Sequence, residues 1–188
     1  GENLDRTIAR EEKSIAEIRA AFEANPHDIA CIIIEPIQGE GGDNHFRPEF
    51  LAQVREICDS NEAMLMFDEV QTGNGRTGSY FAYQKMGFSP DIVTTAKGLG
   101  NGVPIGVCMA RGAAAGVFSP GQHGSTYGGN PLACATASTV VDTIISDKLC
   151  ENASAMGDVI RDTLIAEMQD SSRIVEIRGR GLMLGIEL

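Results

Sequence analysis

The chain has 188 residues, of which 43% are apolar and 22% charged, and its formal net charge is -11 at pH 7. This is the composition of a globular protein with a substantial core, which excludes disordered and fibrous classes, and the acidic balance argues against nucleic acid as a partner. No apolar run approaches the ~20 residues of a membrane span and no signal peptide opens the chain, so we expect a soluble cytoplasmic protein with no membrane partner.

Apolar periodicity predicts a βαβ unit in the first half of the chain. A helix over residues 11–24 ends where Pro26 disfavours helix in the residue before it. The continuous apolar run over residues 29–34 predicts a parallel strand that is covered on both faces. A helix over residues 48–60 has an early proline and one apolar face, and a strand over residues 63–67 completes the unit with a right-handed crossover.

The second half of the chain is predicted to continue the sheet. Asn130 and Pro131 supply the cap and the first position of a long helix that reaches about residue 146. The chain opens without Met and closes on an apolar, strand-like run that has no partner in sequence, so we expect a fragment truncated at both ends. The other predicted elements are a short helix over 79–86, strands over 92–95, near 105–110 and over 174–177, and a helix over 150–168.

Two charged side chains, Asp68 and Lys97, each follow a predicted strand of one parallel sheet. Because the carboxyl ends of parallel strands meet at one edge, where ligands bind, these side chains can converge on a crevice. Residues 92–141 contain no Asp or Glu, so Lys97 lies in a cationic stretch that suits an anion. A structural ion pair is the alternative interpretation. The glycine-rich run over residues 98–102 favours a catalytic role for Lys97 over a structural ion pair, because glycines let the backbone approach a cofactor closely.

Residues 73–78 read G-x-G-x-x-G after a strand, a pattern that also opens dinucleotide-binding units. In that fingerprint the first glycine comes directly at the end of the strand, whereas polar side chains such as Asp68 and Gln71 intervene here. We therefore predict a tight turn in which Arg76 anchors loop carbonyls. NAD(P) binding is kept as the alternative.

Three blocks of the chain resemble a known family. Residues 68–78, 96–106 and 123–132 are similar, in order and spacing, to the signature blocks of class III pyridoxal-phosphate aminotransferases. The resemblance implies an α/β fold of fold type I, with a mostly parallel sheet and flanking helices. It also implies two domains: a partial cofactor-binding large domain over residues 1–147, then a connecting helix and the start of a small domain over residues 148–188.

The same resemblance implies a role for each residue of the 68–71 block and for the lysine. Lys97 would hold pyridoxal 5′-phosphate as a Schiff base and move a proton between the substrate carbon and C4′ of the cofactor. Asp68 would sit against the pyridine nitrogen, where a carboxylate keeps the ring protonated and electron-accepting. Val70 would pack on one ring face and Gln71 would hydrogen-bond the phenolic O3′, while Glu69 belongs to the same cofactor-binding block.

Three further residues match family positions outside that block. Thr126 would bind the cofactor phosphate of the neighbouring subunit of a homodimer, with Ser125 near the substrate. Glu40 matches a glutamate that pairs with an arginine for the substrate α-carboxylate. That arginine, the phosphate-cupping turn and the ring-stacking aromatic lie outside this chain, so we expect the isolated chain to transaminate poorly or not at all.

The resemblance leaves the amino donor open. Residues from Gly73 onward are most similar to acetylornithine aminotransferases, whereas residues 25–50 are more similar to lysine 6-aminotransferases. Both groups transfer a terminal amino group from a basic amino acid to 2-oxoglutarate. We predict N-acetylornithine or ornithine as the donor, as in arginine biosynthesis, with lysine as the alternative. A non-catalytic, oligomerising scaffold is the alternative from a different class.

Cysteines and histidines indicate neither a disulfide framework nor a metal site. The five cysteines are odd in number, widely spaced and contain no C-x-x-C pair, which favours a reducing compartment and buried thiols. The three histidines are scattered, so we expect no metal.

Overall fold

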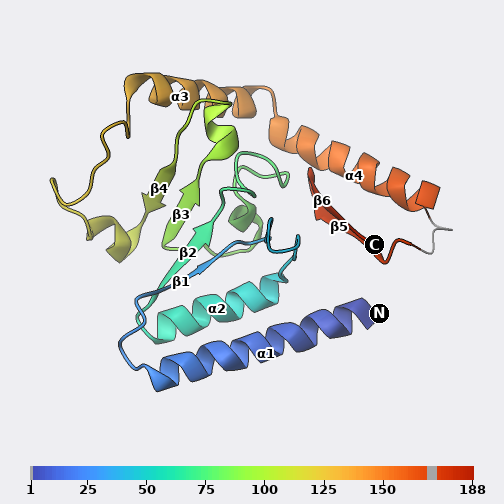
Figure 1. The fold of residues 1–188 in the computed structure, drawn as a ribbon, viewed down its shortest axis with the longest axis horizontal. Helices are drawn as coiled ribbons and strands as arrows, with labels where there is room; N and C mark the ends of the chain where they lie inside the picture. Colours follow the sequence, from blue (N-terminus) through green and yellow to red (C-terminus); the bar gives the residue numbers. More distant parts are fainter. Residues whose placement is uncertain (1, 169–172) are drawn as a thin grey trace.

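The computed structural model describes residues 2–168 and 173–188, and its centre is a four-stranded sheet (Figure 1). The strand order is β1-β2-β3-β4, in which the first three strands run parallel and the fourth antiparallel. The predicted α/β fold with a mostly parallel sheet is confirmed. The strands are β1 (Cys31–Ile34), β2 (Met64–Asp68), β3 (Ile92–Thr95) and β4 (Val107–Ala110).

Two helices, α1 (Glu2–Ala24) and α2 (Pro48–Ser60), lie side by side below the sheet in Figure 1 and form the core with β2. The inward side chains of β2 alternate with half-buried ones, as expected for a strand with one covered face. Helix α1 begins earlier than predicted because the periodic signal starts only at Glu11. That glutamate is buried and accepts hydrogen bonds from the backbone and side chain of Arg47, which join α1 to the start of α2.

The prediction that the first strand is covered on both faces is wrong for the described residues. Ile33 is 60% exposed and Cys31 is also exposed, while Ile32 and Ile34 are half-buried. No described element packs on the outer face of β1. The apolar run therefore predicts the strand correctly but overestimates how much of the strand is buried.

The carboxyl ends of β2 and β3 lead into glycine-rich loops and short 3₁₀ helices. The helix predicted over residues 79–86 is only a single 3₁₀ turn, η1 (Ala82–Lys85), and η2 (Lys97–Gly100) and η3 (Gly112–Gly116) follow β3 and β4. Helix α3 (Pro131–Ser146) packs against η2, and its N-cap Asn130 accepts the N–H of Ala133 through its side chain, as the sequence predicts. Helix α4 (Leu149–Met168) follows.

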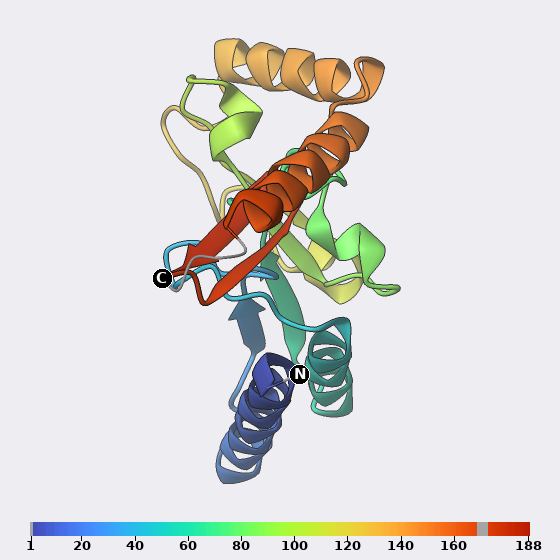
Figure 2. The same cartoon turned by 90° about the vertical axis from the view of Figure 1, so that its right-hand side faces the viewer.

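The chain ends in a hairpin of β5 (Glu176–Arg180) and β6 (Met183–Glu187), which lies beside α4 in both views (Figures 1 and 2). The last apolar run therefore has a partner strand, contrary to the sequence-based expectation. Arg178 donates to the backbone oxygens of Gly42 and Asp43, and Leu182 N–H donates to the carbonyl of Arg76. The hairpin thus docks on loops that surround the strand ends. The domain boundary after residue 147 stays a prediction.

Membrane-spanning segments and buried cysteines were also expected from, or excluded by, the sequence. Among the described residues, no helix is both long and apolar enough to cross a bilayer. Only Cys58 of the five cysteines is buried, Cys150 is half-buried, and the other three are exposed. The expectation of five buried thiols is therefore wrong, because β1, β4 and α3 each carry a cysteine on an uncovered face.

Candidate functional site

Lys97 begins η2, directly beyond the carboxyl end of β3. Its backbone φ is 46°, in the left-handed region, which costs a residue with a Cβ roughly 1–2 kcal/mol. The side chain is exposed and lines a cleft of about 300 Å³. The turn therefore directs the exposed lysine into the cleft.

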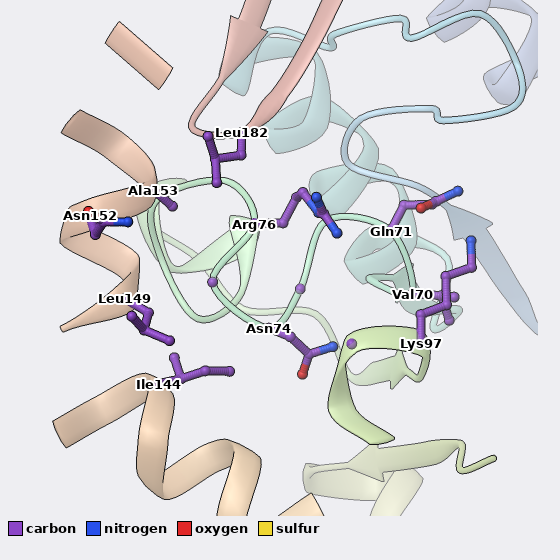
Figure 3. Close-up of a pocket in the computed structure, with 13 residues that line it drawn as sticks. Val70, Gln71, Asn74, Arg76, Lys97, Ile144, Leu149, Asn152, Ala153 and Leu182 are labelled. Atoms are coloured by element: carbon purple, nitrogen blue, oxygen red, sulfur yellow. The ribbon is translucent and has the colours of Figure 1, made fainter. Parts of the chain in front are cut away.

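Val70 and Gln71 lie with Lys97 at one end of this cleft (Figure 3). The side chain of Gln71 packs against the turn at Gly39, where an added Cβ would lie 3.1 Å from its amide nitrogen. Apolar side chains from α3, α4 and the hairpin close the far end of the cleft. These are Ile144, Leu149, Ala153 and Leu182.

Asp68 is the last residue of β2 and pairs in register with Thr94 of β3, so it lies at the same edge of the sheet as Lys97. The side chain is half-buried, and its Oδ1 accepts the N–H of Val70 at 3.0 Å. That hydrogen bond fixes the carboxylate and turns the chain toward Gln71. Asp68 is not among the residues that line the cleft.

Glu69 is fully buried and its carboxylate faces the protein interior. One oxygen accepts the hydroxyl of Thr72 at 2.6 Å and the N–H of Ala82 at 2.8 Å, and the other accepts the N–H of Tyr83 at 2.9 Å. Burial raises the pKa of Glu69, and these hydrogen bonds oppose that rise only in part. Both oxygens are thus occupied by protein donors, which favours a role in shaping the loop over direct contact with a cofactor.

The loop over residues 73–78 forms a tight turn, but its polar side chains do not act as predicted. Among the described residues, no hydrogen bond from the Arg76 side chain to a carbonyl is found, and its guanidinium projects into the middle of the cleft (Figure 3). Asn74 also lines the cleft and donates to the segment before Lys97. The sequence assigned Arg76 to the wrong role and gave no signal for Asn74, because the G-x-G-x-x-G pattern draws attention to its glycines. In the described part of the chain, this loop leads into the 3₁₀ turn η1 and then β3, and not into an α-helix that could receive a dinucleotide pyrophosphate.

Glu40 lies in an adjacent cleft that shares Gln71, Arg76 and Leu182 with the first. Its exposed side chain sits on the turn after β1, which the carboxylate of Glu35 fixes by accepting the N–H of Gly39 at 3.1 Å. Glu40 is thereby placed next to the lysine cleft, although it does not line it.

Ser125 and Thr126 are not brought to Lys97. Ser125 lines a separate cleft of about 590 Å³ together with Ile105, His123 and Tyr127, and Thr126 is exposed. Tyr127 beside them is 83% exposed. The structure therefore gathers Val70, Gln71 and Lys97, with Asp68 and Glu40 close by, and leaves the 123–132 block outside this group.

Comparison with known proteins identifies the family. The family described as Aminotransferase class-III matches residues 2–188. The chain belongs to the class III aminotransferase family. Acetylornithine aminotransferase 1 of Bordetella pertussis is 49% identical over 171 residues, which are 91% of this chain and 43% of that protein. Acetylornithine aminotransferase of Nitrosomonas europaea is 49% identical over 165 residues, which are 88% of this chain and 42% of that protein.

Solved structures of aminotransferases share the fold. Ornithine aminotransferase from Toxoplasma gondii superposes with a TM-score of 0.87 at 40% identity, over 93% of this chain and 41% of that one. Acetylornithine aminotransferase from Elizabethkingia anophelis gives a TM-score of 0.85 at 37% identity, over 92% of this chain and 43% of that one. The chain thus spans less than half the length of these relatives.

Proposed function

We propose that the complete protein is a pyridoxal-phosphate-dependent aminotransferase that moves the terminal amino group of N-acetylornithine or ornithine to 2-oxoglutarate, as in arginine biosynthesis. The observation that carries this proposal is the left-handed turn that aims Lys97 into a cleft beside Val70 and Gln71. The names of the similar relatives support the donor, and lysine is the alternative donor.

The residues present fit the cofactor chemically. Lys97 offers a primary amine, and Asp68 offers a carboxylate at the end of the neighbouring strand. Val70 provides a branched apolar surface and Gln71 an amide that the Gly39 turn supports. The solved ornithine aminotransferase of Toxoplasma gondii has PLP at partial occupancy in its active site. When bound, pyridoxal phosphate supplies an electron-accepting ring that stabilises negative charge on the carbon next to the transferred nitrogen.

Each residue at the strand ends has one part in this proposal. Lys97 would hold the cofactor covalently, and its Nζ, once freed, would move the proton of the substrate carbon that bears the amino group. Asp68 would keep the ring nitrogen protonated. Val70 would provide an apolar contact for the ring and Gln71 would bind the phenolic oxygen. Glu69 contributes indirectly, because its buried carboxylate fixes the loop that carries Gln71.

The remaining residues act at the substrate and at a subunit boundary. Glu40 sits where the two clefts adjoin, a suitable place to govern access of a substrate carboxylate to the lysine. Ser125 and Thr126 lie outside the lysine cleft of their own chain. We propose that the active protein is a homodimer in which Thr126 reaches the cofactor phosphate of the neighbouring subunit and Ser125 lies near its substrate.

The test is covalent trapping in the complete gene product. Pyridoxal phosphate followed by borohydride should leave a stable adduct on the peptide that contains Lys97, detected by mass spectrometry. Lys97→Ala should abolish the adduct, whereas Lys85→Ala, which alters an exposed lysine outside the cleft, should not. An adduct of full yield in Lys97→Ala would refute the assignment.

Substrate choice needs a separate measurement. Formation of glutamate from 2-oxoglutarate is followed with N-acetylornithine, ornithine and lysine as donors. We expect the highest kcat/KM with N-acetylornithine or ornithine. A preference for lysine would support the alternative donor and leave the cofactor assignment intact.

A further inference from the structure

The backbone that precedes Lys97 needs an external support. Ala96 has φ -162° and ψ -142°, and Lys97 has φ 46°, so the chain changes abruptly from strand to left-handed conformation. A lysine is not the residue that such a position favours, because its Cβ crowds the following carbonyl. A conformation of this kind persists where surrounding contacts hold it.

Asn74 supplies two of these contacts from the glycine-rich loop. Its Nδ2 donates to Thr95 Oγ1 and to the carbonyl of Ala96, both at 3.0 Å. The carbonyl of Ala96 can only accept, so the nitrogen of the amide must face it. Asn74 itself has φ 57°, a value that asparagine tolerates better than most residues. Its side chain therefore bridges the loop after β2 and the peptide before Lys97.

Tyr80 fixes the other side of the same amide. Its hydroxyl donates to Asn74 Oδ1 at 3.3 Å, and its carbonyl accepts the N–H of Gly75 at 3.3 Å. The Tyr80 ring packs edge-on against Phe81, with ring centroids 4.8 Å apart. The hydroxyl bond is longer than the ~2.8 Å typical of O–H···O pairs, so it is the weaker part of the arrangement.

We propose that Asn74, supported by Tyr80, is a positioning residue for Lys97. The carbonyl of Ala96 also accepts the N–H of Leu99 at 3.0 Å, so the Asn74 amide and the first turn of η2 hold one oxygen between them. This clamp, which consists of the hydrogen bonds from the Asn74 amide and the Leu99 N–H to the Ala96 carbonyl, sets the direction in which the lysine side chain leaves the backbone. Its consequence for catalysis rests on the proposed function, whereas its consequence for the backbone does not.

The first measurement is independent of the cofactor. In the complete gene product prepared without pyridoxal phosphate, amide hydrogen exchange of Leu99 is compared between the unaltered protein and Asn74→Gly. Glycine accepts the left-handed φ but removes the two hydrogen bonds that the Asn74 amide donates and the one it accepts from Tyr80, so exchange should accelerate by about tenfold or more. Tyr80→Phe, which removes only the weaker bond, should accelerate exchange by a smaller factor.

Asn101→Gly is the matched control. Asn101 caps η2 in the loop that carries Lys97 and has φ 44°, and no hydrogen bond of its side chain is found among the described residues. The same substitution there should leave Leu99 exchange within about threefold of the unaltered protein. Exchange of Leu65 in β2 reports general stability. Equal acceleration at Leu65 and Leu99 in Asn74→Gly would overturn a local clamp, as would an unchanged rate at Leu99.

The second measurement concerns the lysine itself. If the unaltered protein forms the borohydride-trapped adduct on Lys97, Asn74→Gly should weaken the apparent affinity for pyridoxal phosphate by about tenfold, equivalent to about 1.4 kcal/mol. Asn101→Gly should bind as the unaltered protein does. Equal affinity in Asn74→Gly and Asn101→Gly would overturn the positioning role. Failure of the unaltered protein to form an adduct would instead refute the proposed function, and the Leu99 exchange comparison would still decide whether the clamp exists.

Discussion

Arg55 on α2 donates a hydrogen bond to Asp91 Oδ2 at 2.6 Å, and the same oxygen accepts the N–H of Leu65 at 2.9 Å. Asp91 directly precedes β3, so one carboxylate joins α2, β2 and β3 at the end of the sheet opposite Lys97. Burial alone would raise the pKa of Asp91, but the hydrogen bonds from Leu65 and Arg55 outweigh it and the pKa is lowered. The ionised carboxylate therefore stabilises the fold.

Asp91→Asn should reduce the free energy of unfolding by about 2–3 kcal/mol, because it removes a charge-assisted hydrogen bond to a partly buried guanidinium. A lowered pKa in the folded state means that this contribution is present above the unfolded value of about 4 and is lost as the pH falls through the folded value. Urea unfolding from pH 7 to pH 3 should therefore show the difference between the two proteins shrinking below about pH 4.

Asp59→Asn serves as the control for that experiment. Asp59 also contacts Arg55, at 2.7 Å, but its side chain is 64% exposed. Exposed ion pairs contribute roughly 0–1 kcal/mol, so the loss should be smaller and nearly independent of pH. Equal losses in the two variants would contradict the anchoring role of Asp91.

Glu69 should show the opposite dependence on pH. Burial raises its pKa, so between the unfolded value of about 4.3 and the raised folded value the native state binds more protons than the unfolded state. Stability contributed by Glu69 therefore increases as the pH falls through that window. Glu69→Gln should cost about 1–3 kcal/mol at pH 7, because one of the three protein donors would then face an amide NH₂.

Urea unfolding of Glu69→Gln from pH 7 to about pH 4 checks this sign. On acidification, the unaltered protein should become more stable relative to Glu69→Gln. Its advantage over Asp91→Asn should instead become smaller below about pH 4. A difference that stays constant between Glu69→Gln and the unaltered protein would show that the carboxyl does not titrate abnormally.

Several element boundaries follow from local sequence signals. Pro48 and Pro131 mark helix starts, because a proline at the first turn costs no hydrogen bond, and α2 and α3 have the predicted bounds. Strand β3 is also correctly bounded, since Pro90 precedes it closely and a glycine-rich run follows it. Helix α1 begins before the predicted start, because its first residues are polar and the helical period has few apolar side chains to reveal it.

Contacts between distant segments are predictable only where the topology of the sheet requires them. The sequence predicts that Asp68 and Lys97 share a sheet edge, because the strands that carry them are parallel. The hydrogen bond from the Asn74 amide to Ala96 spans 22 positions, and no local pattern in the sequence predicts it. The proposed roles of the site residues stay predictions.

Gly157→Ala should reverse the usual effect of this substitution. Alanine within an exposed helix is favoured over glycine by about 1 kcal/mol. In α4, however, a Cβ at Gly157 would lie 2.0 Å from the carbonyl oxygen of Gly181 in the hairpin turn. Relieving that clash must shift the hairpin, so we expect a net loss of about 1–3 kcal/mol in unfolding free energy and faster proteolysis of β5 and β6.

Gly116→Ala is the control, because a Cβ at Gly116 meets nothing within 4 Å. Its effect on unfolding and proteolysis should be small. Stabilisation by Gly157→Ala would contradict the close packing of α4 on the hairpin. If the unfolding of residues 148–188 separates from that of the remaining chain in Gly157→Ala, the predicted domain boundary after residue 147 gains support.

The proposed crossed homodimer predicts complementation between inactive variants. Lys97→Ala lacks the covalent lysine, and Thr126→Val lacks the hydroxyl for the phosphate while keeping the side-chain shape. If Thr126 serves the neighbouring subunit, a hybrid dimer of the two variants contains one complete site. Mixing the proteins under conditions that allow subunit exchange should therefore restore activity. No recovery in verified hybrids would contradict the crossed contact, because a Thr126 acting in its own subunit leaves both sites incomplete.

Cysteine alkylation reports which faces of the chain are covered in the complete protein. Burial raises the pKa of the Cys58 thiol to about 11, so at pH 8 only about one thiol in a thousand is ionised. Cys58 should therefore react with iodoacetamide more than a hundredfold more slowly than an ordinary exposed thiol.

Cys108 and Cys134 are exposed on β4 and α3, close in sequence to the segment that carries Thr126. If the subunits meet there, both thiols should be protected at high protein concentration and react on dilution to monomers, as followed by mass spectrometry. Fast alkylation of both at every concentration would place the subunit boundary elsewhere.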